Sequence, residues 1–144
     1  MLERTRVVPR PIDEVFAFFS DPANLERLTP PWLRFCVLGA TTESLGEGAE
    51  IDYRPRVRGI PLRWRSLIRA WNPPHGFVDE QLRGPYRLWV HAHTFEPVNG
   101  GTRVGDRVRY AVLGGALVDR LLVRPDLERI FDYRRERLEE LLAK

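Results

Sequence analysis

The sequence predicts an α+β fold in which a meandering antiparallel sheet packs against a long C-terminal helix. Two observations carry this prediction. Between residues 33 and 113, alternating apolar and polar residues recur in runs separated by short turns, which is typical of strands joined as hairpins. From Leu127 to Leu141, apolar residues instead follow the i, i+3, i+4, i+7 spacing of an amphipathic helix.

The N-terminal part predicts one strand followed by two short helices. Residues 2–8 alternate enough for a first strand, which the two prolines of VVPRP end. Pro11 suits the first turn of a helix, and PIDEVFAFFSD then carries apolar residues at helical spacing. Asp21-Pro22 breaks this helix and can start a second one, PANLERL, which closes at TPPW, residues 29–32.

Six further strands and a helix complete a single domain over residues 1–144. The helix is expected in two pieces, because Pro125 lacks an N–H and should kink or restart it after a first piece at 115–123. The sheet then has seven strands, with two short helices between its first two strands. Strands two to seven are expected at residues 33–43, 49–58, 61–72, 77–83, 86–96 and 103–113.

Composition indicates a globular chain with a modest positive charge. The 144 residues are 43% hydrophobic and 30% charged, with a formal net charge of +3. No apolar run is long enough for a transmembrane helix, and MLERTRVVPRP lacks the apolar centre of a signal peptide, so a cytoplasmic location is expected. The single cysteine, Cys36, excludes an internal disulfide.

This order of elements resembles the helix-grip fold of the START and birch-pollen-allergen superfamily, often called SRPBCC. The branch it is most similar to is that of the bacterial polyketide cyclase/dehydrase and lipid-transport proteins. VVPRPIDEVFAFFSDPANLERLTPPW and LERIFDYRRERLEELL carry the resemblance, which covers the whole chain. It implies a curved antiparallel sheet that grips the C-terminal helix, with an apolar cavity between them. No cofactor is expected. Members mostly bind hydrophobic small molecules such as lipids, and some are cyclases or aromatases.

The register of the last hairpin decides where two histidines point. Asn99-Gly100 is a strong signal for a two-residue turn. Pairing outward from this turn sets Glu96 opposite Arg103 and His93 opposite Asp106. A three-residue turn would shift this register by one residue. The two-residue turn faces Trp89, His91, His93 and Phe95 inward, and makes His93 and Asp106 cross-strand neighbours. The acid would raise the pKa of the histidine and fix its tautomer.

The cavity is predicted to have apolar walls and one polar end. The polar end would be His91, His93 and Asp106, with either Asp79 and Gln81 or Glu80 added from strand five. The opening is expected near 29–32, 59–61 and 84–85. The predicted walls are Phe16, Phe19, Tyr53, Trp64, Trp89, Phe95, Val108, Tyr110 and Phe131.

Three functions compete for these residues. The favoured one is binding or transport of a hydrophobic or amphipathic small molecule. The second is a cyclase-like enzyme in which His93 and Asp106 act as the general base, with a tyrosine or Arg134 supplying a proton or holding an oxyanion. A metal site at His91 and His93 is not expected, because no ligand-rich motif exists and His75 lies in a proline-bounded turn.

Arginines supply the third possibility, a basic interaction surface on the outer face of the sheet. Nucleic acid is not an expected partner, because this face has no interleaved aromatic residues for base stacking. Arg134 is separate, since it lies on the apolar stripe of the last helix, either at the cavity rim, which is favoured, or reaching inward to an acid or an anionic ligand. The outer arginines are Arg54, Arg56, Arg58, Arg63, Arg65, Arg69, Arg103, Arg107 and Arg109.

Overall fold

One curved antiparallel sheet and a long C-terminal helix form the framework of the protein. The computed structural model describes residues 1–33, 37–40, 45–57 and 60–142. The sheet strands are β1 (Leu2–Val8), β2 (Val37–Ala40), β3 (Glu50–Tyr53), β6 (Trp64–Asn72), β7 (Gly76–Arg83), β8 (Leu88–Val98) and β9 (Gly101–Ala111). The helices are α1 (Ile12–Phe19), α2 (Pro22–Leu28), η1 (Pro31–Leu33), α3 (Gly115–Val118), η2 (Asp119–Val123) and α4 (Arg124–Leu141).

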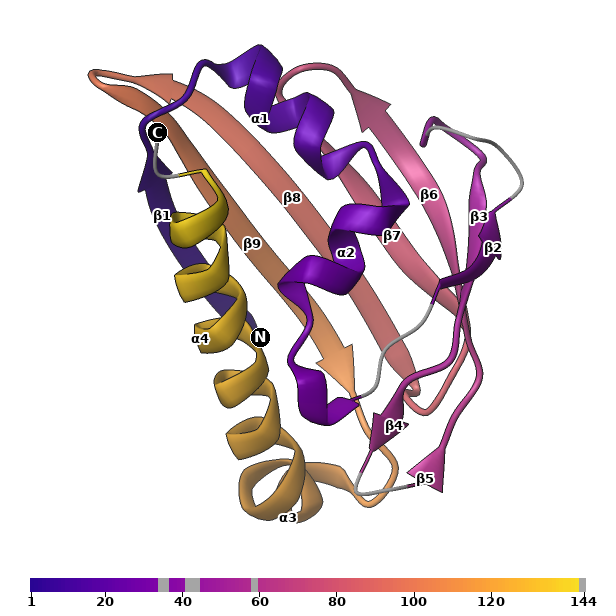
Figure 1. Ribbon diagram of the computed structural model, residues 1–144. Coiled ribbons are helices and arrows are strands. Elements are labelled where there is room, and N and C mark those ends of the chain that lie inside the picture. Colours follow the sequence, from indigo (N-terminus) through magenta and orange to yellow (C-terminus); the bar gives the residue numbers. More distant parts are fainter. Residues whose placement is uncertain (34–36, 41–44, 58–59, 143–144) are drawn as a thin grey trace.

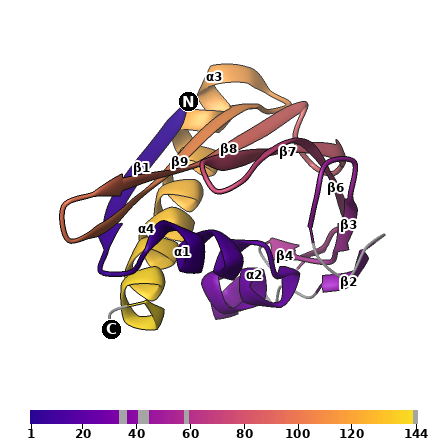
Figure 2. The ribbon, with the colours of Figure 1, turned by 90° about the horizontal axis from the view of Figure 1, so that it is seen from above.

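The strands lie in the order β1-β9-β8-β7-β6-β3-β2, and every adjacent pair is antiparallel. The sheet bends around its concave side, where α4 lies along the β1 end and α1 and α2 lie across the opening (Figures 1 and 2). The predicted fold class, a seven-stranded curved sheet on a long C-terminal helix, is therefore confirmed.

Two predicted strands are shorter than expected. The strand predicted at 49–58 divides into β3 and β4 (Arg56–Val57), and the strand predicted at 61–72 divides into β5 (Ile60–Pro61) and β6. Pro55 lies at the first division and Pro61 near the second, and proline cannot donate to a strand ladder. β4 and β5 form a separate two-stranded sheet. Of the strand predicted at 33–43, the structure describes β2 and Leu33, and Leu33 belongs to η1, so the strand does not begin there.

The predicted register of the last hairpin is confirmed. Val98 pairs with Gly101 across the two-residue turn, and Glu96 pairs with Arg103, Phe95 with Val104 and His93 with Asp106. Gly100 has φ of 89°, a left-handed conformation that glycine adopts without strain. Because side chains alternate across a strand, this register turns Trp89, His91, His93 and Phe95 to the concave side.

The C-terminal helix begins as predicted from Pro125. α3 and the π-helical turn η2 precede it, and α4 starts at Arg124 with the proline in its first turn, where a missing N–H costs no hydrogen bond. The face of α4 that meets the sheet buries Leu127, Phe131, Arg134 and Leu138.

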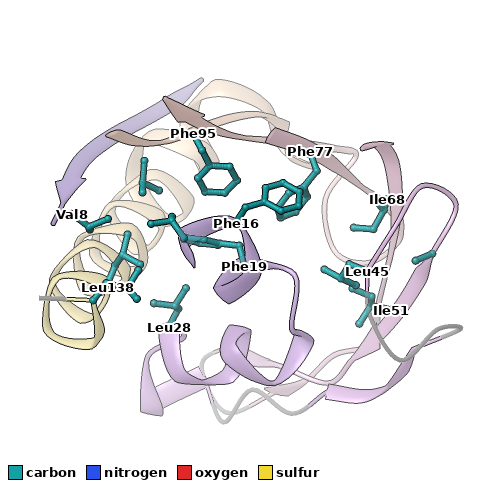
Figure 3. Packing of buried hydrophobic residues seen from close by; sticks show 14 of the residues in the cluster. Val8, Phe16, Phe19, Leu28, Leu45, Ile51, Ile68, Phe77, Phe95 and Leu138 are labelled. Carbon is teal, nitrogen blue, oxygen red and sulfur yellow. The ribbon is translucent and has the colours of Figure 1, made fainter. Parts of the chain in front are cut away.

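Apolar packing divides into two clusters. In the larger one, Phe16 and Phe19 of α1 pack edge-on or tilted against Phe95, and Leu138 of α4 joins them (Figure 3). The smaller cluster surrounds Trp89, Val108 and Phe131.

Candidate functional site

A cavity of about 370 Å³ opens between the concave face of the sheet, α2 and the first turns of α4. Most of its lining is apolar. The lining residues are Leu25, Leu28, Thr29, Leu33, Leu45, Ile51, Tyr53, Pro55, Leu62, Trp64, Ser66, Ile68, Phe77, Asp79, Pro85, Tyr86, Trp89, His91, His93, Val112, Leu113, Val123, Leu127, Ile130, Phe131 and Arg134.

Only part of the predicted wall lines this cavity. Tyr53, Trp64, Trp89 and Phe131 do, as do the polar residues His91, His93 and Arg134. The predicted wall residues that lie elsewhere are Phe16, Phe19, Phe95, Val108 and Tyr110, and Asp106 is also absent from the lining. The first three fill the core beneath α1, and Val108 is fully buried. Strand alternation predicted the correct face, but it could not predict which part of that face α1 covers.

The sequence analysis missed the aliphatic part of the lining. Leu25 and Leu28 come from α2, while Val123, Leu127 and Ile130 come from η2 and α4. Helical periodicity already predicted that Leu127 and Ile130 face the sheet, so these two residues could have been assigned to the cavity wall from the sequence. Near the expected opening, Thr29, Leu33 and Pro85 line the cavity. Ile60 and Pro61 do not line it, and Gly59 lies outside the described residues.

His91 and His93 stack on each other in the middle of the cavity wall. Their ring centroids are 3.8 Å apart with an angle of 26° between the rings, and Phe77 stacks on the other face of His93 at 4.1 Å. The two histidines lie two residues apart on β8, so they share one face of the strand. Both side chains are buried.

Each histidine bonds to an acid on a neighbouring strand, in a crossed arrangement. Along the backbones His91 is opposite Asp79 of β7, and His93 is opposite Asp106 of β9. The hydrogen bonds instead join diagonal neighbours, because His91 Nε2 lies 2.8 Å from Asp106 Oδ1 and His93 Nε2 lies 2.5 Å from Asp79 Oδ2. The directly opposite pairs are 3.7 and 3.9 Å apart. The parity left open for strand five is thus resolved, with Asp79 on the cavity side.

Arg134 of α4 completes the group, and its expected position at the rim is wrong. Its Nε and one terminal nitrogen each lie 3.3 Å from a carboxylate oxygen of Asp106. The same terminal nitrogen lies 3.4 Å from His93 Nδ1. The Arg134 side chain is only 11% exposed. Its charge compensates the buried carboxylate of Asp106, which would be costly to bury unpaired. These five residues, Asp79, His91, His93, Asp106 and Arg134, are called the polar cluster below.

Burial and charge act against each other on the ionisation of the polar cluster. Burial alone would raise the pKa of Asp106, but the Arg134 charge and the His91 hydrogen bond hold it well below its ordinary value. Burial likewise opposes ionisation of Asp79, while the hydrogen bond from His93 and the charges nearby lower its pKa. Burial, with the neighbouring His91, lowers the pKa of His93 to about 4. The predicted rise in the pKa of this histidine is wrong, because desolvation outweighs its acid partner.

The neutral form of His93 has a defined tautomer. Arginine can only donate, so Arg134 makes Nδ1 of His93 the acceptor, and Nε2 carries the proton donated to Asp79. Both ring nitrogens are therefore occupied. His91 differs, because its Nε2 bonds to Asp106 while the nearest acid atom to its Nδ1, Asp79 Oδ2, is 3.9 Å away.

Asp79, His91 and His93 also have the composition of a metal site, with one ligand atom from each lying within 4.8 Å of the others. Their arrangement fits a cation poorly. His93 Nε2 holds a proton against Asp79, and the guanidinium of Arg134 adjoins the same ring. In addition, stacked rings place their nitrogen edges side by side, whereas zinc ligands converge from tetrahedral directions.

The outer arginines form a face of mixed charge. Four of them pair with acids: Arg65 with Glu50 and Asp52, Arg69 with Glu80, Arg103 with Glu96 and Arg107 with Glu3. Arg56 belongs to the small β4–β5 sheet, so its predicted place on the main sheet face is wrong. Arg58 lies outside the described residues, and Arg54, Arg63 and Arg109 are exposed.

No helix within the described residues is long and apolar enough to span a membrane. Among curated proteins, none matches this sequence.

Solved structures share the fold over nearly the whole chain. Protein Ms6760 from Mycobacterium smegmatis is 19% identical, with a TM-score of 0.71 over 98% of this chain and 89% of that one. TTHA0849 from Thermus thermophilus is 19% identical, with a TM-score of 0.67 over 97% of each chain. Ara h 8.0201 is 15% identical, with a TM-score of 0.70 over 98% of this chain and 95% of that one.

Sequence comparison adds the family to the fold. The model of the family described as polyketide cyclase / dehydrase and lipid transport matches residues 8–139, which is most of the chain. The helix-grip architecture, the concave cavity and this match agree with one another, and the chain belongs to the polyketide cyclase / dehydrase and lipid transport family.

Proposed function

We propose that the protein binds a hydrophobic or amphipathic small molecule in the cavity between the sheet and α4. The observation that carries this proposal is a cavity of about 370 Å³ with a mainly apolar lining and one polar wall. Small-molecule sites are typically concave, mostly apolar and supplied with a few placed polar groups. Burial of the apolar part of a ligand would provide most of the affinity, and the polar cluster would orient it.

The surface beside the cavity supports an apolar ligand as well. Leu113 lines the cavity and is 71% exposed, and Leu117, Leu121 and Leu122 of the adjoining helical turns are also exposed. α3 and β5 lie at the same end of the molecule (Figure 1). Exposed apolar residues next to a cavity are typical of ligand-binding grooves and reduce the cost of passing an apolar molecule inward.

Binding can be tested with Nile red, an uncharged apolar dye, and with native mass spectrometry of freshly purified protein. Ile130→Trp enlarges a half-buried lining residue of α4 and is expected to weaken dye binding at least about tenfold. Glu136→Trp, on an exposed position of the same helix, is the matched control and should bind as the wild type does. If Nile red does not bind, or if Ile130→Trp binds it unchanged, the proposal is wrong.

A second candidate is a cyclase-like enzyme in which His91, and not His93, is the general base. His91 lines the cavity, and its bond to Asp106 would orient the ring while leaving Nδ1 toward the ligand. His93 is a poorer base, because both of its nitrogens are engaged.

The cyclase candidate can be tested by incubating the protein with linear poly-β-ketone thioesters and analysing the products by mass spectrometry. Loss of a cyclised product in His91→Gln supports the role, and an unchanged rate excludes it.

A further inference from the structure

The polar wall of the cavity presents a carboxylate without a matching free cation. Among the described lining residues, Arg134 is the only arginine or lysine and Asp79 is the only acid. Arg134 is already committed, since both of its hydrogen bonds to acid go to Asp106, which lies behind the lining. The charged group that the cavity offers to a ligand is therefore the carboxylate of Asp79.

Asp79 has one oxygen in use and one available. Oδ2 accepts the short hydrogen bond from His93, whereas no hydrogen bond within the described residues reaches Oδ1. The side chain is 16% exposed, on the wall of the cavity. An accessible carboxylate oxygen in an apolar cavity is an acceptor in need of a donor.

The charge of the polar cluster disfavours an anionic ligand. Its two carboxylates outnumber its one guanidinium, and its most exposed side chain is that of Asp79. A ligand carboxylate placed at this wall would lie against Asp79 with little water to screen the repulsion.

We infer that the cavity selects ligands whose polar end is a hydrogen-bond donor, such as a hydroxyl or a protonated amine, and that it discriminates against free fatty acids and other carboxylates. The donor would bond to Asp79 Oδ1, with the apolar remainder against the aliphatic and aromatic lining. This inference rests on the proposed function, because it assigns the chemistry of the ligand that the cavity would hold. The sequence alone did not determine on which face of β7 the side chain of Asp79 lies.

A set of ten-carbon probes tests the selectivity by displacement of Nile red at neutral pH in the presence of a chelator. The probes are 1-decanol, decylamine, decanoate and decyl methyl ether. Their polar ends are, respectively, a hydroxyl, an ammonium, a carboxylate and an ether oxygen that can only accept a hydrogen bond. Decanol and decylamine are expected to displace the dye at concentrations at least about tenfold lower than decanoate and the ether. This ranking needs no variant, so it does not depend on whether a substitution folds.

Asp79→Asn tests whether this carboxylate is the cause. The amide removes the negative charge, so decylamine should lose its advantage over decanoate by about tenfold or more. Glu80→Gln is the matched control, because Glu80 lies on the opposite face of β7 and pairs with Arg69; its ranking should equal that of the wild type.

The outcomes separate this inference from the proposed function. If Nile red itself fails to bind, the proposed function is wrong. If Nile red binds but decanoate or the ether displaces it as well as decanol does, or if no probe displaces it, the donor selectivity is wrong and the cavity remains. A ranking that Asp79→Asn leaves unchanged also overturns the assignment to Asp79.

Discussion

Arg134 of α4 donates to Asp106 of β9 through two nitrogens, each 3.3 Å from a carboxylate oxygen, in a part of the protein where both side chains are 11% exposed. This pair joins the C-terminal helix to the centre of the sheet. Asp106 in turn holds His91, and Arg134 also contacts His93. The orientation of the polar wall therefore depends on a helix residue some forty positions further along the chain than the histidines.

Arg134→Met is expected to destabilise the protein strongly. The substitution keeps an apolar side chain of similar length but leaves Asp106 and Asp79 as buried charges without a cation. Breaking a buried ion pair in this way costs about 3–5 kcal/mol of unfolding free energy. Urea denaturation measures the change, and Arg120→Met, at an exposed arginine of η2, should alter stability by less than about 0.5 kcal/mol.

The double variant Arg134→Met/Asp106→Asn identifies the cause of that loss. If the uncompensated carboxylate is responsible, the double variant should be more stable than Arg134→Met alone, with a coupling free energy of at least about 1 kcal/mol. Equal losses in the single and double variants would show that packing of the guanidinium, and not its charge, is what matters.

The polar cluster also shows what the sequence alone can and cannot predict. Asn99-Gly100 determines the register of β8 on β9, so the inward direction of His91 and His93 was predictable from local turn chemistry. The partners were not, because the hydrogen bonds follow diagonals between strands, and β7 joins β8 through a turn containing Pro85 that follows no hairpin rule. The position of Arg134 depends on how far α4 approaches the sheet, which helical periodicity does not specify.

Gly76→Ala is expected to destabilise β7 where it meets β8. A Cβ at Gly76 would lie 2.3 Å from the carbonyl oxygen of His93, and a backbone atom cannot move aside without disturbing the ladder. Overpacking of this kind costs about 1–3 kcal/mol, which lowers the melting temperature by several degrees. Calorimetry measures this, with Gly46→Ala as the control, because a Cβ there meets nothing within 4 Å. Equal melting temperatures for the two variants would contradict the close approach.

Asp21→Ala is expected to weaken the start of α2 and, with it, one side of the cavity. Asp21 Oδ1 accepts a hydrogen bond of 3.0 Å from the backbone N–H of Ala23, satisfying one of the free donors at the helix start. Its loss costs about 1 kcal/mol of unfolding free energy. Asp13→Ala, within α1, removes an exposed acid without such a bond and is the comparison. Urea denaturation curves that coincide for the two variants would exclude the capping role.

The buried neutral His93 should make the protein less stable in mild acid. Its folded-state pKa of about 4 lies below the ordinary value of 6.5, so the unfolded chain takes up the proton first. The unfolding free energy therefore falls as the pH drops from about 6.5 to about 4, by up to about 1.4 kcal/mol for each pH unit. Asp79 and Asp106 act in a lower window, since their lowered pKa values add stability that is lost only as the pH falls below about 3.8.

His93→Gln isolates this contribution. The variant is expected to be less stable than the wild type near pH 7, because Asp79 and Arg134 lose a fitted partner, but its stability should fall less steeply between about pH 6.5 and 4.5. Urea denaturation across this range gives both slopes. His75→Gln is the control, since His75 is exposed in the β6–β7 turn, and its slope should match that of the wild type. If His93→Gln and the wild type lose stability in parallel over this range, then burial does not hold His93 neutral in the folded protein.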